Sequence, residues 1–217
     1  MYKEIKAWLG TLSSQKALVK DPGSNGASII ANPFGFVPQG YGNGVTYFKW
    51  DTTKIGTGIQ VTNEGKAVLL KEGAYVFRSV IGDTGMNSGT HYWEIHADSR
   101  TENELKIGLV TKRDFNCDTA FSDYEFGYSY YGLGQLRHNS NSVGAPYGKK
   151  FKNSGVLGIY LDMNKGSLSF ALNGEYWGEA YKTDALKKGP IYAAVALLHM
   201  AGCTLETGKP APSYFLH

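Results

Sequence analysis

The chain has little that could stabilise it outside the cell or hold it in a membrane. It has two cysteines in 217 residues, Cys117 and Cys203, which set no disulfide framework. It has no Asn-x-Ser/Thr glycosylation site, and its first residues do not develop the apolar stretch of a signal peptide. No run approaches the roughly 18 consecutive apolar residues of a membrane span. We therefore expect a soluble cytoplasmic or nuclear protein with free thiols and no membrane contact.

Charge is also scarce, which bears on the class of partner. Charged residues make up 19% of the chain and the formal net charge is +3, too modest for a nucleic-acid-binding protein. The only basic clusters, at 149–152 and 187–188, are interpreted as solvated turns. No HExxH motif occurs, and His91 and His96, five residues apart, would lie on opposite faces of a strand. The sequence indicates no metal and no cofactor.

Glycine and aromatic residues, by contrast, are abundant. The 28 glycines and an aromatic content of 13% favour an all-β domain with many turns. The clearest β pattern lies in 155–181, where Leu168, Phe170 and Leu172 alternate on one face and Asn173-Gly174 follows as a type I′ turn signal. Some twelve short strands with frequent turns predict a bent sandwich of two antiparallel sheets, a concanavalin-like jelly roll.

Alternation along the strands predicts which side chains share a face. In the strand 91–97, Trp93, Ile95 and Ala97 should share one face. Ile107 and Leu109 should point inward, whereas Tyr128, Tyr130 or their neighbours are expected to face outward. The other strands are expected near 47–50, 58–62, 66–70, 75–80, 106–111, 125–131, 134–138, 156–161, 191–198 and 202–206, with one beginning near 175.

The first 44 residues have a different composition pattern from the rest. Ile5, Trp8, Leu9 and Leu12 have helical spacing, which predicts a short helix near 3–12. The stretch 21–44 is rich in glycine and proline and reads as loop. We expect 1–44 to be a helix and a wrapping segment packed on the sandwich, and 45–217 to be the domain itself.

Catalytic patterns are weak throughout the chain. The glycine-containing stretches 127–132 and 144–150 depart from the nucleophile-elbow and phosphate-loop patterns in spacing and context. A glycoside hydrolase would need two facing carboxylates. Glu102 and Glu104 lie in a predicted turn, and Asp123 and Glu125 lie at the edge of a strand. The sequence therefore does not predict an enzyme.

Four motifs occur in an order that matches a known family. They are SGTHYWEI at 88–95, KIGLVT at 106–111, GYSY with LRHN between 127 and 139, and LDMNKGSLSF with NG and GEAY between 161 and 181. In order and spacing, over about residues 45 to 206, they resemble the SPRY domain family. The resemblance implies a non-catalytic sandwich that grips peptides or folded proteins with inter-strand loops, often as the substrate-selecting part of a ubiquitin ligase.

Within that family the chain most resembles the SOCS-box-linked subgroup, although its pocket residues differ. Arg78 matches the subgroup's pocket arginine, but Val80 stands in place of its proline. Phe121 or Tyr124 takes the approximate place of its loop tyrosine, and Leu198-His199-Met200 replaces Val-Trp-Gly. We expect a recognition module without a visible effector domain.

The candidate partner-binding residues come from this comparison and from the aromatic loops. They are Arg78, Val80, Phe121, Tyr124, Tyr147, His199 and Met200. Amphipathic side chains of these kinds are enriched in interface hot spots. We expect a monomer that binds a protein or a linear peptide. The alternatives are a carbohydrate-binding or glycan-cleaving sandwich, for which Glu125 would be tested, and an oligomerisation scaffold.

Overall fold

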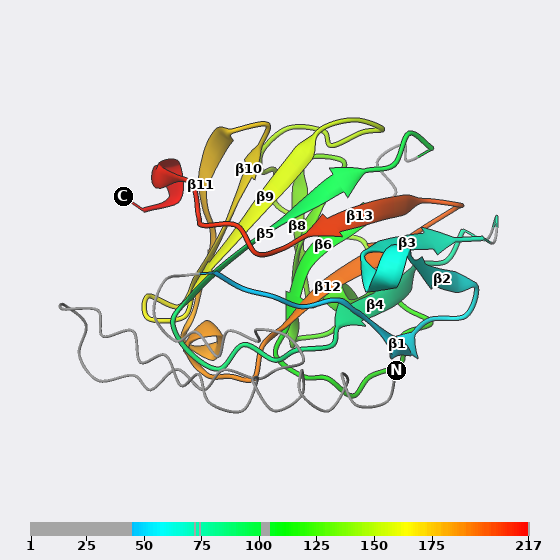
Figure 1. Cartoon of the computed structure of the whole chain (residues 1–217), viewed down its shortest axis with the longest axis horizontal. Helices are drawn as coiled ribbons and strands as arrows, with labels where there is room; N and C mark the ends of the chain where they lie inside the picture. Colours follow the sequence, from blue (N-terminus) through cyan, green and yellow to red (C-terminus); the bar gives the residue numbers. More distant parts are fainter. Residues whose placement is uncertain (1–44, 72, 74, 101–104, 217) are drawn as a thin grey trace, which may run out of the picture. The chain divides into compact units, whose positions relative to one another are not determined.

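The structure is a computed structural model that describes residues 45–71, 73, 75–100 and 105–216. In this part of the chain thirteen strands form two antiparallel sheets, which confirms the predicted all-β sandwich (Figure 1). The predicted helix near 3–12 lies outside the described residues, so the division of the chain at residue 44 stays a prediction. None of the described helices is long and apolar enough to cross a membrane.

The first sheet has six strands in the order β1-β4-β12-β6-β7-β8. Sequence neighbours β6, β7 and β8 form a meander, whereas β12 comes from near the end of the chain to lie between β4 and β6. The strands are β1 (Trp50–Ile55), β4 (Arg78–Gly82), β6 (Leu105–Val110), β7 (Gly127–Tyr131), β8 (Gln135–His138) and β12 (Tyr192–Leu197).

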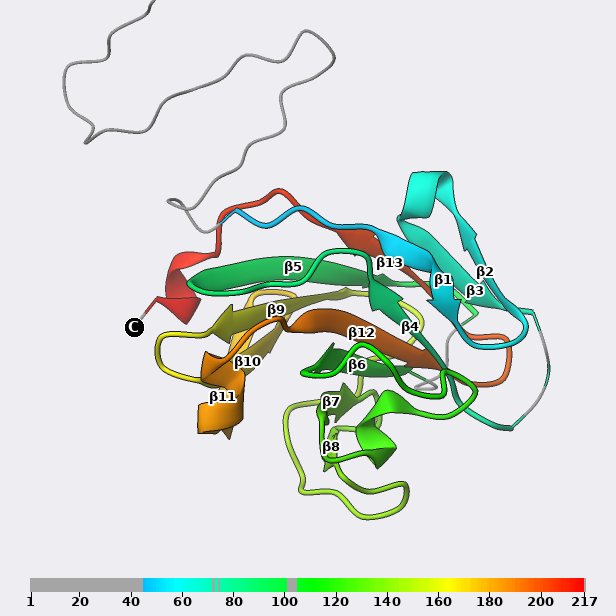
Figure 2. The same cartoon turned by 90° about the horizontal axis from the view of Figure 1, so that it is seen from below.

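The second sheet has seven strands in the order β11-β10-β9-β5-β13-β3-β2. Figure 2 shows β5 of this sheet above β12, β6 and β7 of the first sheet. The strands are β2 (Ile59–Thr62), β3 (Ala67–Leu70), β5 (Thr90–Ala97), β9 (Val156–Asp162), β10 (Ser167–Leu172), β11 (Glu175–Lys182) and β13 (Gly202–Glu206).

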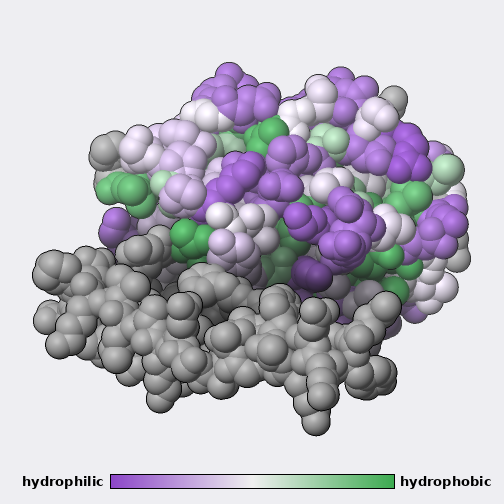
Figure 3. Space-filling model, viewed as in Figure 1, coloured by the Kyte–Doolittle hydropathy of each residue, from purple (hydrophilic) through white to green (hydrophobic). Residues whose placement is uncertain are grey.

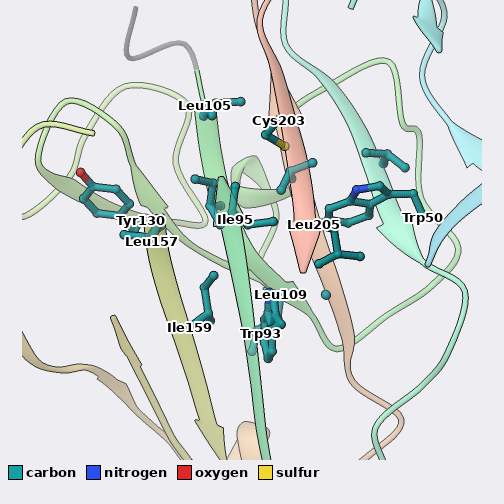
Figure 4. Packing of buried hydrophobic residues seen from close by; sticks show 14 of the residues in the cluster. Trp50, Trp93, Ile95, Leu105, Leu109, Tyr130, Leu157, Ile159, Cys203 and Leu205 are labelled. Carbon is teal, nitrogen blue, oxygen red and sulfur yellow. The ribbon is translucent and has the colours of Figure 1, made fainter. Parts of the chain in front are cut away.

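The main core fills the space between the two sheets. Trp93 and Ile95 of β5 point into it beside Leu157 and Ile159 of β9, as Figure 4 shows. Ile107 and Leu109 enter from the other sheet and are fully buried, as predicted. The alternating side chains of β10 also follow the prediction, because Leu168 and Phe170 are buried and Leu172 packs against them. The apolar strand faces therefore assemble the sandwich.

The turn between β10 and β11 has the conformation that its sequence favours. Asn173 has φ 51° and Gly174 has φ 83°, so both central residues have positive φ, as a type I′ turn requires. Asn173 also accepts, through its side-chain oxygen, a hydrogen bond of 2.9 Å from the backbone N–H of Val156. This contact ties the turn to the start of β9.

Two expectations about strands differ from the structure. Tyr128 and Tyr130 of β7 point into the core, with 6% and 0% of their surface exposed, so an outward orientation is wrong for both. Their neighbours Ser129 and Tyr131 take the outer face instead, as the pairing of Ser129 with Arg137 indicates. In addition, β4 begins at Arg78, although the sequence suggested a strand from Tyr75.

Each sheet also buries a smaller apolar cluster on its outer face. On the six-stranded sheet, the connection 111–126 folds back and buries Phe121 and Ala120 against Ile81, Ala194 and Ala196. On the seven-stranded sheet, a one-turn 3-10 helix, η4 (Ser213–Phe215), covers a second aromatic cluster. Different parts of the chain therefore cover the outer faces of the two sheets.

Candidate functional site

Two loops meet beside the paired strands β4 and β12. Leu197, the last residue of β12, pairs with Arg78, the first residue of β4, so the loops before β4 and after β12 lie side by side. The ring of Tyr75 stacks on His199 with centroids 4.5 Å apart and planes within 11°. Tyr75, Val76 and Met200 are 78%, 49% and 46% exposed. We call Tyr75, Val76, His199 and Met200 the loop-end surface.

The backbone after β12 explains why these side chains project. His199 and Met200 have φ of 49° and 61°, a left-handed conformation that is uncommon for residues other than glycine. The N–H of Ala201 donates to the carbonyl of Leu198 over 3.1 Å and closes the turn. His199 Nδ1 lies 3.3 Å from the carbonyl oxygen of Gly73 and joins the two loops. Contacts from both loops therefore hold the stacked rings of Tyr75 and His199 in place.

Arg78 lies at the start of β4 and is engaged mainly by its own chain. Its Nη1 donates to the carbonyl of Asp118 over 2.8 Å, and its Nε forms an ion pair of 3.4 Å with Asp118 Oδ1 that lacks hydrogen-bond geometry. Asp118 also accepts a 2.6 Å hydrogen bond from the N–H of Thr57. That hydrogen bond, with the charge of Arg78, lowers the pKa of Asp118 despite partial desolvation. Arg78 thus anchors the connection 111–126.

Ser79, the next residue, fastens the same connection to the sheet. Its Oγ donates to the carbonyl of Thr119 over 2.7 Å and accepts from the N–H of Phe121 over 2.9 Å. The backbone N–H of Ser79 donates to the carbonyl oxygen of Cys117 over 2.7 Å. A Cβ at Gly127 would lie 2.0 Å from the carbonyl oxygen of Phe121, so the connection can approach β7 only because a glycine is there.

Tyr124 ends the connection in a small aromatic group. Its ring stacks on Phe126 with centroids 4.9 Å apart, and Phe115 lies 6.0 Å away. Its hydroxyl accepts a 3.1 Å hydrogen bond from Thr119 Oγ1. Tyr124 is half-buried, so part of its ring still faces solvent.

The structure separates six of the seven candidate residues into three groups. His199 and Met200 are exposed on the loop-end surface, and Arg78 and Tyr124 are half-buried and hold or end the connection 111–126. Val80 and Phe121 have no exposed surface, so they cannot contact a partner directly and act only by supporting neighbours.

Tyr147 lies apart from these loops. Its hydroxyl donates to the carbonyl of Gly178 in β11 over 2.7 Å, and its ring packs against Tyr130 and Trp177. This side chain belongs to the packing between the sheets, because its hydroxyl and its ring are both used there.

Tyr75 and Val76 were missed by sequence reasoning. Together with Phe77 they form a consecutive apolar run, so they were interpreted as strand residues, although Gly73 shortly before them is a signal for a longer loop.

The described residues contain no group of three or more His, Cys, Asp or Glu side chains that could hold a metal ion. Of the carboxylates weighed for catalysis, Asp123 forms a 3.1 Å hydrogen bond with Lys106 Nζ. On the face shown in Figure 3, hydrophobic residues form only small, separate groups among hydrophilic ones.

Comparison with known proteins agrees with this arrangement. A family model described as the SPRY domain matches residues 90–210. Among curated proteins, the chain is 31% identical over 113 residues to the probable ATP-dependent RNA helicase ddx1 of Dictyostelium discoideum. That alignment spans 52% of this chain and only 14% of the length of the helicase.

Solved structures share the fold at low sequence identity. The SPRY domain of human HERC1 is 19% identical, with a TM-score of 0.57, over 75% of this chain and 99% of that one. The TRIM65 PSpry domain is 18% identical, with a TM-score of 0.58, over 75% and 90%. Stonustoxin is 20% identical, with a TM-score of 0.55, over 73% of this chain and 27% of that one. At these identities the likeness concerns the fold alone.

Proposed function

This chain belongs to the SPRY domain family, whose members are protein-interaction modules, and we propose that it binds a linear peptide or a folded protein through its loop-end surface. We further propose that it does so without catalysis, as a monomer inside the cell. In a ubiquitin-ligase or signalling assembly such a domain would select the substrate.

The observation that carries the proposal is the stacked pair of Tyr75 and His199, with Met200 beside it. A tyrosine that is 78% exposed would ordinarily be mobile, but here its ring is held against His199. Pre-ordered aromatic side chains lose little conformational entropy on binding, so their contact area contributes efficiently to affinity. Methionine adds an adaptable apolar contact.

Arg78 and Tyr124 support this surface as positioning residues. Arg78 holds Asp118, and Tyr124 accepts from Thr119 on the same connection. Loss of either should therefore change the shape of the loops near the surface. The proposal leaves the SOCS-box-linked peptide preference open, because the proline and the tryptophan of that subgroup's pocket are absent here.

The test begins with affinity purification from cells and identification of the retained partner by mass spectrometry. Isothermal titration with the purified partner then compares the wild type with Tyr75→Ala. Since hot-spot truncations cost about 2 kcal/mol or more, we expect affinity to fall roughly 30-fold or more. Tyr47→Ala is the matched control, because Tyr47 is also exposed (56%) and precedes β1, near the opposite end of β4.

Two outcomes would contradict the proposal. Unchanged affinity for Tyr75→Ala and for His199→Ala would place the binding site elsewhere. Specific hits on a glycan array, abolished in Tyr75→Ala, would instead favour the carbohydrate-binding alternative.

A further inference from the structure

The outer face of the six-stranded sheet holds two buried cations near the loop-end surface. Lys106 of β6 is 1% exposed and Arg137 of β8 is 8% exposed. Lys106 Nζ donates to Asp123 over 3.1 Å and lies 4.4 Å from the ring centroid of Phe77. Both cations also lie over the ring of Tyr131, at 5.8 Å for Lys106 and 5.6 Å for Arg137.

Arg137 differs from Lys106 because two of its three guanidinium nitrogens are buried without an acceptor. Its Nε and Nη1 are buried and have no hydrogen-bond partner. A buried guanidinium normally has a carboxylate or several carbonyl oxygens around it, since an unpaired buried charge costs several kcal/mol. Its contact with the ring of Tyr131 offsets only part of that cost.

The neighbouring charges make the imbalance larger. Burial lowers the pKa of Lys106, and the charge of Arg137 lowers it further, while Asp123 opposes both effects. Among the described residues, Asp123 is the carboxylate that pairs with Lys106, and no described carboxylate forms an ion pair with Arg137. The two positive charges of Lys106 and Arg137 are therefore balanced by the single negative charge of Asp123 among these contacts.

From this unmet charge we propose that Arg137 receives a carboxylate of the bound partner, an aspartate or glutamate side chain. The inference rests on the proposed function and adds the chemistry of the partner. Because Nε and Nη1 present their N–H groups on different sides of the guanidinium, a carboxylate can accept a single charge-assisted hydrogen bond from either of them. Binding would pair a charge that the folded chain leaves unpaired.

The site is continuous with the loop-end surface. Phe77 follows Tyr75 by two residues, and its ring lies 5.8 Å from the ring of Tyr131, which in turn faces Arg137. A partner segment that places an apolar side chain against Tyr75 therefore has a cation farther along the same side of the sheet. We expect partners to combine an apolar anchor with an acidic residue.

The loop after β8 covers part of the guanidinium. A Cβ at Gly144 would lie 2.6 Å from Arg137 Nη1, so the backbone of this loop rests on the cation. Most residues from Asn139 to Pro146 are exposed, and few buried contacts resist their displacement. Entry of a carboxylate to Nη1 therefore requires a shift of this loop.

The first test uses small probes and does not require a known partner. The Nε–H signal of Arg137, assigned by its loss in Arg137→Gln, is followed by NMR during titration with N-acetyl-aspartate amide. We expect a saturable shift with this carboxylate and none with N-acetyl-asparagine amide. Absence of a shift would overturn the inference, and a shift with inorganic phosphate alone would assign the site to phosphoryl groups instead.

The second test uses peptides displayed on phage and selected on the wild type and on Arg137→Gln. We expect an acidic residue at a fixed distance from an apolar one in the wild-type selection, and loss of that acidic preference in the variant. For a selected peptide, Arg137→Gln should weaken binding about 10- to 100-fold, the effect of a hydrogen-bonded charge. Arg100→Gln is the control, because Arg100 is already paired with Asp98.

The outcomes separate the two proposals. Selected peptides without acidic bias that still depend on Tyr75 would overturn the role of Arg137 and leave the proposed function standing. If the selection on the wild type gives no peptide at all, peptide binding fails as a function, and the NMR titration still decides whether Arg137 accepts a carboxylate.

Discussion

The outer faces of the two sheets are closed in different ways. On the seven-stranded sheet, Glu94 accepts hydrogen bonds from Tyr92 Oη over 2.8 Å and from Lys209 Nζ over 2.7 Å, and His96 Nε2 lies 3.2 Å from it. Nearby, Phe215 stacks on Tyr160 with centroids 5.2 Å apart. Every charge in this group has a partner, as expected of a face that only stabilises the fold.

On the six-stranded sheet, the connection 111–126 covers a similar apolar cluster, but Nε and Nη1 of Arg137 are left without an acceptor. The two faces have comparable aromatic packing and differ in the satisfaction of their buried charges. Natural proteins tend to leave such imbalances where function requires them. This difference supports the proposal that function lies on the six-stranded sheet and its loops, and five variants test it.

The largest expected effect is the loss of stability when a buried ring is removed from the apolar cluster on either outer face. Phe121→Ala and Phe215→Ala each remove a buried ring, so each should lower the free energy of unfolding by about 3–5 kcal/mol, measured by chemical denaturation. Only Phe121→Ala should also weaken partner binding, because only the connection 111–126 adjoins Arg78. Equal losses of binding in the two variants would remove the distinction between the faces.

Ser79→Ala should destabilise the protein less. The change leaves the carbonyl of Thr119 and the N–H of Phe121 without their partner, and a buried unsatisfied group costs about 1–3 kcal/mol. Hydrogen exchange should become faster in residues 117–123 and stay unchanged in β5. Uniformly faster exchange would mean that the serine stabilises the whole sandwich and not the connection alone.

Glu94→Gln should reduce stability in a pH-dependent way. Burial raises the pKa of Glu94, but hydrogen bonds from Lys209, Tyr92 and His96 outweigh it, and the net shift is downward from 4.5. A carboxyl with a depressed pKa stabilises the fold above about pH 4.5, and this contribution is lost as the pH falls further. The variant should lose about 1–3 kcal/mol at neutral pH and show a flatter decline in acid. Parallel pH profiles of wild type and variant would contradict this role.

Arg137→Gln should have the smallest effect on stability. The change removes a buried cation with two unpartnered nitrogens, so the free energy of unfolding should stay within about 0.5 kcal/mol or rise. The same variant should lose the acidic preference described above. A loss of more than 2 kcal/mol would show that the arginine is a structural residue of this face.

Much of the fold could be predicted because its signals are local. The alternation in β5 and β10 and the Asn173-Gly174 turn follow from the two-residue period of strands and from turn chemistry. The orientation of β7 could not be predicted, because alternation shows which residues share a face but not which face is inside. The hydroxyl of Tyr130 can be buried since it donates to the carbonyl of Lys149, a contact 19 residues away.

The candidate site was less predictable, because it depends on contacts between distant segments. Arg78 and His199 were singled out from the sequence, and the pairing of β4 with β12 brings their loops together. Tyr75 was read as a strand residue, since an exposed loop tyrosine and a buried strand tyrosine look alike in sequence. Arg137 could not be singled out, because the absence of an acceptor is a property of its surroundings.

By itself, then, the sequence determined the two-sheet sandwich, its family and its turns, because strand period and turn chemistry act over a few residues. The tertiary structure alone decided which tyrosines are buried, which loops meet and which charge is unpaired. Those features arise in the one sheet that contains β4, β6, β8 and β12. More than a hundred residues of chain separate β4 from its neighbour β12. Burial and charge balance at that sheet depend on all of them at once.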